Sequence, residues 1–208
     1  MIPKKFRCFL SAIKRKLLHT KFRESKLAHQ LLDGLRGLEI GASIHNPFGL
    51  KTLNVDFSDD YTTVFKQEEF RLFKAFQPVH IVACGDNLPF KDNSVDFVIS
   101  SHVIEHFYDP VKTIKEWLRV SRVGGYVFMI VPHKERTFDK DRPRTSIAEI
   151  IERHKDLSPP KINHQHHYSV WKTEDLVEIC NYYQWPIVAV QDVDDKVGNG
   201  FTVVIKKT

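Results

Sequence analysis

Three acidic side chains stand at or near the ends of successive predicted strands, where they could bind one ligand together. Glu39 lies in a strand at 37–41, Asp56 ends a strand at 53–56, and Asp86 follows a strand at 79–83. A carboxylate that ends the second strand can accept both hydrogen bonds of a ribose diol, and one after the third strand can accept a bond from an exocyclic amine. Each acid alone could be a simple turn residue. Their joint placement favours a site for a nucleoside that carries positive charge.

The turn after the first strand, "EIGASIHNP", contains a single glycine. Gly41 permits a tight turn and a close approach of a ligand to the backbone. A dinucleotide site would need G-x-G-x-x-G to seat a pyrophosphate on a helix N-terminus. The missing glycines therefore disfavour a nicotinamide-dependent oxidoreductase, which stays a less favoured alternative.

Strands and helices alternate from residue 34 onward, which predicts an α/β fold. Further strands are expected at 95–100, 126–132, 186–193 and 200–207, and the last two should form an antiparallel hairpin. Helices are expected at 111–120 after the Asp109-Pro110 cap, at 145–154, and after a Thr173 cap. Gly124-Gly125 is expected to end the first of these helices and open the fifth strand. The predicted architecture is a doubly wound, mostly parallel, seven-stranded Rossmann-like sheet with a terminal antiparallel strand.

The positive charge of the chain is concentrated at its N-terminus. Residues 1–26 hold nine of the 31 Lys and Arg residues, and the remainder carries 22 basic and 25 acidic side chains. The main domain is therefore mildly acidic, and we expect no nucleic-acid partner. Residues 1–33 are predicted to be a basic, amphipathic helical segment. This segment could contact an anionic membrane surface, could cap the domain, or could be a transit peptide.

The expected location is the cytoplasm, with peripheral attachment to a membrane surface through the basic segment as an option. No apolar run approaches the length of a membrane span, and Lys and Arg interrupt the N-terminal apolar residues of any signal peptide. Cys8, Cys84 and Cys180 lie far apart. They are typical of reduced thiols in a reducing compartment.

Four motifs give the chain a family resemblance. "LEIGA", "NVDFSDD", "VACGDNLPFKDNSVDFVISSHVIEHFYDP" and "VSRVGGYVFMIVP" resemble the ordered motifs of class I S-adenosylmethionine-dependent methyltransferases, and most closely the small ones with an "LPF…DFV…EH" pattern. The chain departs from the family in its reduced glycine turn and in Arg122-Val123, where the family usually has Lys-Pro. The resemblance implies that residues 34–208 form the methyltransferase domain. Residues 134–170 would be a lid insertion on the side of the methyl acceptor.

The resemblance also implies S-adenosylmethionine as the cofactor and gives each motif a role. The methionine portion would be flanked by Glu39, Gly41, Ala42 and Ser43. Asp56 would hold the ribose hydroxyls, and Asp86 and Asn87 would meet the adenine. Leu88, with Pro89 and Phe90, could give the adenine an apolar wall, and Ser101 and His102 would line the cofactor below its sulfonium.

Two histidine-containing stretches could indicate a metal, but we predict none. His102-x-x-Glu105-His106 has the spacing of one class of zinc hydrolase, which requires both histidines on one helix face. Here His102 follows directly on a buried strand, and the resemblance makes Glu105 and His106 structural residues that bond neighbouring loops. "NHQHHYSVW", at 163–171, could bind a transition metal. No Cys or paired carboxylate stands close by in the sequence, so these histidines are expected to line the acceptor pocket or to lie on the surface.

The expected reaction is in-line displacement of a methyl group by an acceptor oxygen or nitrogen. His133, at the end of the fifth strand, is the first candidate for a general base, although it could equally be a loop histidine. His164, His167, Tyr168 and Asp139 are weaker candidates. Arg142 and Arg144 could bind an acidic acceptor, or could simply belong to an exposed loop.

The acceptor is expected to be a small molecule. No Asn-Pro-Pro-Tyr-type tetrapeptide follows the fourth strand, which argues against methylation of nucleic-acid bases within this family. A glycan or a lipid-linked precursor is preferred because the basic segment could sit on a membrane. The main alternative is a non-catalytic methyltransferase-like binding module.

Overall fold

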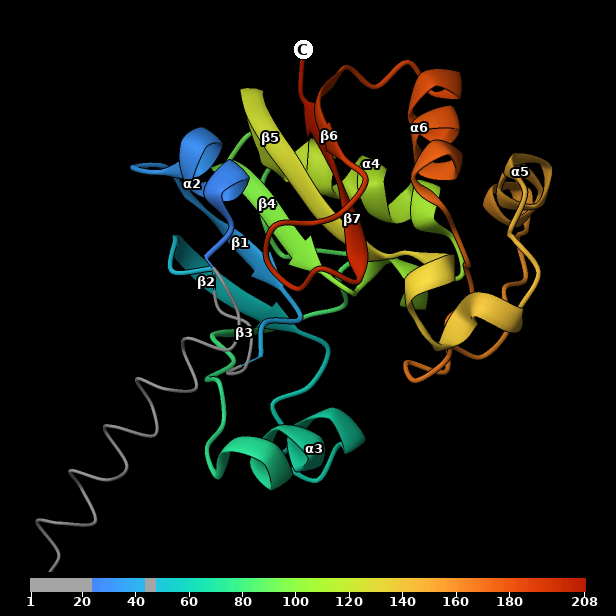
Figure 1. The fold of residues 1–208 in the computed structure, drawn as a ribbon. Coiled ribbons are helices and arrows are strands. Elements are labelled where there is room, and N and C mark those ends of the chain that lie inside the picture. Colours follow the sequence, from blue (N-terminus) through green and yellow to red (C-terminus); the bar gives the residue numbers. More distant parts are fainter. Residues whose placement is uncertain (1–23, 44–47) are drawn as a thin grey trace, which may run out of the picture.

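A seven-stranded sheet forms the centre of the computed structural model, which describes residues 24–43 and 48–208 (Figure 1). Its strands are β1 (Arg36–Ile40), β2 (Lys51–Asp56), β3 (Ile81–Val82), β4 (Val95–Ser101), β5 (Ser121–Pro132), β6 (Ile187–Gln191) and β7 (Gly200–Lys206). The strand order is β3-β2-β1-β4-β5-β7-β6. β1 to β5 pair in parallel, whereas β7 runs antiparallel to both β5 and β6. The predicted fold class and the terminal hairpin are confirmed.

Helices cover both faces of the sheet. The α-helices are α2 (Lys26–Leu32), α3 (Val64–Phe73), α4 (Pro110–Val120), α5 (Ile147–Lys155) and α6 (Thr173–Tyr182). Three short 3₁₀ helices are η1 (Ile104–His106), η2 (Lys134–Arg136) and η3 (Phe138–Asp141). Figure 1 shows α2 on one face of the sheet, with α4 and α6 on the other.

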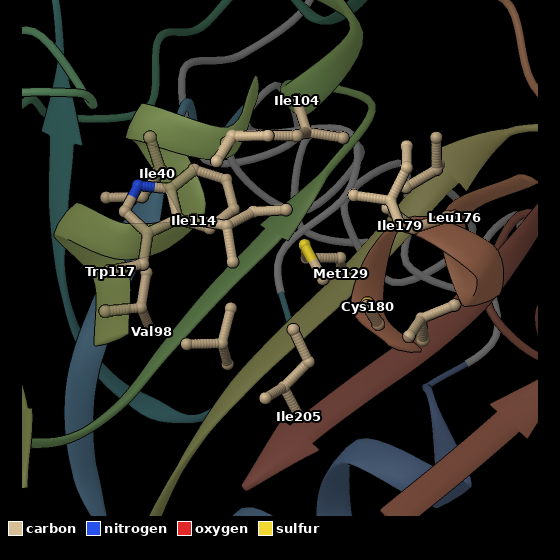
Figure 2. Close-up of a cluster of buried hydrophobic side chains, with 14 of the residues drawn as sticks. Ile40, Val98, Ile104, Ile114, Trp117, Met129, Leu176, Ile179, Cys180 and Ile205 are labelled. Carbon is tan, nitrogen blue, oxygen red and sulfur yellow. The ribbon is translucent and has the colours of Figure 1, made fainter. Parts of the chain in front are cut away.

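The alternation of side chains along the central strands divides the core into two layers. On β5, Val127 and Met129 belong to the cluster under α4 and α6, whereas Phe128 and Ile130 belong to the cluster under α2. Figure 2 shows the first cluster, in which Trp117 of α4 and Ile179 of α6 pack above the strands. Both faces of these strands are therefore buried, as continuous apolar sequence predicts for a covered parallel sheet.

Local signals set the start of α4, as expected. The carboxylate of Asp109 accepts the backbone N–H of Lys112 at 2.9 Å, and Pro110 is the first helical residue. The helix ends at Val120 as predicted, but the predicted stop signal was wrong, because β5 begins at once with Ser121. The Gly124-Gly125 pair lies inside β5, at an irregularity where β4 and β5 change register. A Cβ on Gly125 would lie 2.4 Å from the carbonyl oxygen of Asp96, so only glycine permits this approach of the two strands.

The predicted helices at 145–154 and after Thr173 correspond to α5 and α6. α5 is confirmed, with Ser146 as its N-cap. α6 starts one residue earlier than predicted, because Lys172 occupies the cap position and Thr173 is the first helical residue. The hydroxyl of Thr173 donates to Asp192 instead of capping the helix, while the carboxylate of Asp175 accepts the N–H of Lys172 at 2.7 Å. α3 was not predicted; the hydroxyl of Thr63 caps this helix.

The described part of the basic segment packs on the domain. Ala28 and Leu32 of α2 are fully buried against Phe97, Ile99 and Phe128 of the sheet. Residues 1–23, where most of the predicted amphipathic pattern lies, are outside the described residues, so the proposed boundary at residue 33 stays a prediction. None of the described helices combines the length and the apolar character that a membrane span requires.

Replacing Trp117 should destabilise both the core and the turn after β3. Trp117 is fully buried, and its indole N–H donates to the carbonyl oxygen of Gly85 at 2.9 Å. We expect Trp117→Ala to lower the free energy of unfolding by about 3–5 kcal/mol. Trp117→Phe should cost about 1–3 kcal/mol, since it leaves the Gly85 carbonyl without its donor.

Chemical denaturation measures both changes. Leu157→Ala is the matched control, because Leu157 is 97% exposed and its loss should change stability by less than about 0.5 kcal/mol. Equal effects of Trp117→Ala and Leu157→Ala would contradict the described core.

Candidate cofactor site

One cavity of about 790 Å³ lies beyond the carboxyl ends of β1, β2, β3 and β4. This is the edge at which ligands bind in open α/β sheets. Eight of the ten predicted cofactor residues line it: Glu39, Gly41, Ala42, Ser43, Asp56, Asp86, Ser101 and His102. Asn87 and Leu88 are not among the lining residues. The acids from three strand ends therefore share one cavity, which is the arrangement expected from the sequence.

The glycine turn brings the backbone to the cavity wall. Gly41 has a φ of +67°, and a Cβ at this position would lie 2.9 Å from Cγ2 of Val103. Its N–H donates to the carbonyl oxygen of Val55 at 2.8 Å, and the N–H of Ala42 donates to Oδ1 of Asn54 at 3.1 Å. Gly41 is thus required both by its positive φ and by the lack of room for a Cβ beside Val103.

Asp56 ends β2 and faces the cavity. One of its carboxylate oxygens accepts the N–H of Phe57 at 2.7 Å. Burial raises the pKa of Asp56, and the nearby Lys66 ammonium partly opposes this shift. Lys66 itself is buried, and its ammonium donates to Glu69 at 3.1 Å and to the carbonyl of Gln77 at 3.0 Å.

Glu39 is the most deeply buried of the three acids, with 6% of its surface exposed. Burial raises its pKa to about 7, although a hydrogen bond from the hydroxyl of Thr52, at 3.1 Å, and the charge of Lys196 both lower it. A cationic group that enters the cavity would stabilise the ionised form of this buried carboxylate and so lower its pKa again.

Asp86 is held by an ion pair. Its carboxylate lies 2.8 Å from the ammonium of Lys112. Burial alone would raise the pKa of Asp86, but bonds from the Cys84 thiol and from Lys112 outweigh it, so the pKa is lowered. Asp86 is therefore an ionised acceptor at the cavity wall.

The neighbours of Asp86 do not form the apolar wall suggested by the sequence. Leu88 is buried in the core, and its N–H donates to the carboxylate of Glu116 at 2.7 Å. Asn87 is exposed. Pro89 and Phe90 are not lining residues either; the aromatic side chains of the wall are those of Phe57, Phe65, Phe107 and Tyr108.

Ser101, the last residue of β4, and His102, which follows it, both line the cavity. His102 has a φ of +56°, and its ring nitrogens lie 3.1 Å from the hydroxyl of Ser101 and 3.0 Å from Oδ1 of Asn199. Because η1 begins only at Ile104, His102 and His106 do not share a helix. This observation agrees with our argument against a zinc-hydrolase motif.

The candidate catalytic residues are divided by the structure. His164 lines the cavity, with its ring stacked on Phe57 at 4.2 Å between centroids. His133 is 7% exposed and does not line it; its Nδ1 accepts the N–H of Glu135 at 3.2 Å. Burial lowers the pKa of His133. Tyr168 is also outside the lining, and its hydroxyl accepts the N–H of Asn163 at 2.9 Å.

The other polar candidates between residues 134 and 170 form bonds within the protein. Nδ1 of His167 lies 2.7 Å from the carboxylate of Asp139, which also pairs with Arg142 at 2.6 Å. Arg144 pairs with Asp175. None of these side chains lines the cavity, so the structure does not bring the two arginines to it.

Several lining residues were missed by the sequence argument. Lys66, Glu69 and Leu72 come from α3, Arg153 and Asp156 come from the end of α5, and Asn199 comes from the turn between β6 and β7. The Thr63 cap was a detectable signal for α3. Nothing local indicates that α5 and the β6–β7 turn reach the same cavity, because that placement depends on how the chain packs.

Glu39→Gln should remove part of the pH dependence of stability. Between pH 4.5 and about 7, the unfolded chain has released the Glu39 proton while the folded chain keeps it. Wild-type stability therefore falls as the pH rises through this window. The variant cannot ionise, so it should gain up to about 3 kcal/mol relative to wild type across the window.

Urea denaturation at a series of pH values measures this difference. Glu152→Gln is the matched control, because the Glu152 side chain is 74% exposed and the substitution should leave the slope unchanged. Parallel stability curves for wild type and Glu39→Gln would show that the folded state imposes no such shift.

Comparison with known proteins gives a consistent result. Residues 38–129 match the family model described as a methyltransferase domain. An uncharacterized protein of Methanocaldococcus jannaschii is 31% identical over 138 residues, which cover 59% of this chain and 63% of that protein. An uncharacterized methyltransferase of Mycobacterium sp. (strain KMS) is 50% identical over 46 residues, or 22% of this chain and 18% of that protein. The chain thus spans less than two thirds of the length of these relatives.

The fold has solved counterparts. A SAM-dependent methyltransferase from Aquifex aeolicus superposes with a TM-score of 0.56 at 18% identity, covering 94% of this chain and 97% of that one. This likeness shows the fold, and the family model supplies the sequence relationship. Residues 38–129 are therefore similar to the methyltransferase-domain family, and the chain shares the fold of this solved methyltransferase.

Proposed function

We propose that the chain binds S-adenosylmethionine in the cavity and transfers its methyl group to an oxygen or nitrogen of a small molecule. The observation that carries this proposal is the convergence of Glu39, Asp56 and Asp86 on one cavity with aromatic walls. Three acids with no phosphate-binding turn suit a ligand that has a positive charge, a ribose and a purine, and no phosphate.

Each wall of the cavity has a distinct task in this proposal. Asp56 accepts hydrogen bonds from the ribose hydroxyls, and Asp86 accepts one from the adenine amine. Glu39 and the Gly41 turn lie beside β1, where the carboxylate of Glu39 would balance the ammonium of the methionine portion. Phe57, which follows Asp56 directly and lines the cavity, would pack on the purine.

When bound, the cofactor supplies an electrophilic methyl group on a sulfonium. The protein contributes position, because the acceptor must lie in line with the methyl carbon and its departing sulfur. The lid provides the acceptor side: Arg153, Asp156, Ile162 and His164 line the same cavity opposite the strand ends. Among the four candidate catalytic residues, His164 is the one that lines the cavity, so we assign acceptor contact to it in preference to His133.

Calorimetry tests cofactor binding directly. The purified chain should bind S-adenosylmethionine and its demethylated product, S-adenosylhomocysteine, with a stoichiometry of one, and should not bind NADH. Binding without methyl transfer to any acceptor would favour the non-catalytic alternative. Binding of NADH alone would favour an oxidoreductase, and binding of none of the three would contradict the proposal.

Asp56→Asn should weaken cofactor binding. The substitution keeps the size of the side chain but removes the charge that strengthens two hydrogen bonds to a ribose diol. We expect a loss of about 1–3 kcal/mol, or roughly 5- to 150-fold in affinity. Asp59→Asn is the matched control, since Asp59 is exposed, lies three residues away and does not line the cavity. Equal affinities of wild type and Asp56→Asn would remove the ribose assignment.

We extend the proposal to a glycan or lipid-linked precursor as the acceptor. Its support is the basic, apolar-patterned sequence of residues 1–26, which would suit an anionic membrane surface. With methyl-labelled S-adenosylmethionine, label should pass into a lipid-linked sugar fraction of a cell extract, and removal of residues 1–23 should reduce this transfer when the acceptor is held in anionic vesicles. Label that appears only in other small molecules would exclude this acceptor class while leaving the methyltransferase proposal intact.

A further inference from the structure

A cluster of two histidines and a glutamate lies where the lid meets η1. Oε1 of Glu105 is 3.8 Å from Nε2 of His106 and 3.9 Å from Nε2 of His167. All three potential ligand atoms lie within 4.8 Å of one another. The two imidazoles come from segments 61 residues apart in the sequence, and both turn the same ring nitrogen toward one carboxylate.

The carboxylate of Glu105 is buried and has no hydrogen-bond partner. Only 1% of the side chain is exposed, and neither of its oxygens is bonded within residues 24–43 and 48–208. Burying an acid in this way is costly unless a charge or a donor is supplied. The other buried acid nearby, Asp139, differs in having both the Arg142 guanidinium and the His167 imidazole as partners.

The outer nitrogens of both histidines are already fixed. Nδ1 of His106 lies 3.2 Å from the carbonyl oxygen of His166, and Nδ1 of His167 lies 2.7 Å from the carboxylate of Asp139. Metal-binding histidines are usually held in this way, by a backbone carbonyl or a carboxylate on the nitrogen that faces away from the ion. If each Nδ1 donates its proton to these acceptors, each Nε2 keeps its lone pair directed at Glu105.

The backbone holds the two segments together. The carbonyl oxygen of Glu105 accepts the N–H of Tyr168 at 2.7 Å and that of Ser169 at 3.3 Å. The predicted bonding of the Glu-His pair to neighbouring loops is thus confirmed for the Glu105 backbone and the His106 ring. These backbone bonds do not use the Glu105 carboxylate, which can therefore bind a ligand.

We propose that Glu105, His106 and His167 form a binding site for a divalent transition-metal ion of the zinc type. Imidazole and carboxylate ligands suit such ions, and three protein ligands leave one position of a tetrahedral site open. Zinc bonds of about 2.0–2.1 Å place tetrahedral ligand atoms about 3.4 Å apart. The two Glu105–histidine distances of 3.8 and 3.9 Å would shorten by about 0.5 Å on binding, and no pair of ligand atoms would have to move together by more than about 1.4 Å. Because His106 also lines the large cavity, the ion lies at the wall of the acceptor side.

This assignment changes the expectation from the sequence, which was that no metal binds. That expectation covered both His102-x-x-Glu105-His106 and the histidines at 163–171, the latter because no Cys or paired carboxylate stands close by in the sequence. The structure keeps His102 apart, near Asn199, and brings Glu105 to His167. The third ligand is His167 instead. The proposal is independent of methyl transfer, since its test measures metal binding to the whole chain.

The test is calorimetric titration of chelator-treated protein with zinc chloride, together with thermal unfolding. Wild type should bind one Zn²⁺ and become more stable to heat, because a ligand that binds only the folded state stabilises it. Glu105→Gln and His167→Gln should each abolish this binding. Asp139→Asn keeps all three proposed ligands but weakens the bond that orients His167, together with the ion pair to Arg142, and should weaken Zn²⁺ binding by about 10- to 100-fold.

The matched control is His166→Gln. His166 is exposed, adjoins His167 and contributes only its carbonyl oxygen, so this variant should bind Zn²⁺ like wild type. The proposal would be overturned if wild type did not bind Zn²⁺. It would also be overturned if wild type, Glu105→Gln and His167→Gln bound Zn²⁺ equally, because the ion would then be bound by histidines elsewhere on the surface. If one variant does not fold, the other variant decides between these outcomes.

Discussion

The parallel register of β1, β2 and β4 is the constraint on which the candidate cofactor site depends. Ile40 pairs with Val55 on one side and with Ser100 on the other, so Gly41, Asp56 and Ser101 all follow the same row of the sheet. The backbone hydrogen bonds that fix this row therefore also bring three loops to one cavity. A slip of one residue in β2 would turn Asp56 to the opposite face, because side chains alternate along a strand. The chemistry of the site thus rests on strand pairing more than on any single contact within it.

Features with a local physical cause could be predicted from the sequence. Asp109-Pro110 favours a helix start through its own cap and its fixed φ, and Gly41 after a buried strand permits a turn with positive φ. Acids at strand ends follow the same logic, because parallel strands end at a common edge. Leu88 shows where this reasoning stops. Its apolar side chain could contact a purine or pack in the core. It packs in the core because Glu116 and α4 hold it there, and no residue near Leu88 in the sequence indicates this contact.

The histidines show the same limit more sharply. The spacing from His102 to His106 suggested a metal motif, yet a positive φ and a hydrogen bond to Asn199 turn His102 away from it. His164 and His167 are three residues apart and looked equivalent as pocket residues. The fold places one against Phe57 in the cavity and the other against Asp139 beneath the lid. Sequence spacing identified the residue types that matter, and only the packing of the lid on η1 decided their partners.

Four acids at or near the candidate cofactor site and the proposed metal site fall into two groups. Asp86 and Asp139 have their own cations, Lys112 and Arg142, so their charges are balanced within the chain. Glu39 and Glu105 are also buried, but within residues 24–43 and 48–208 neither forms an ion pair with a lysine or an arginine, and burial raises the pKa of each, to about 7 and about 8. A folded protein tolerates such groups at a cost in stability. A positively charged ligand beside either carboxylate would offset this cost, which is the physical link between the two proposed binding sites.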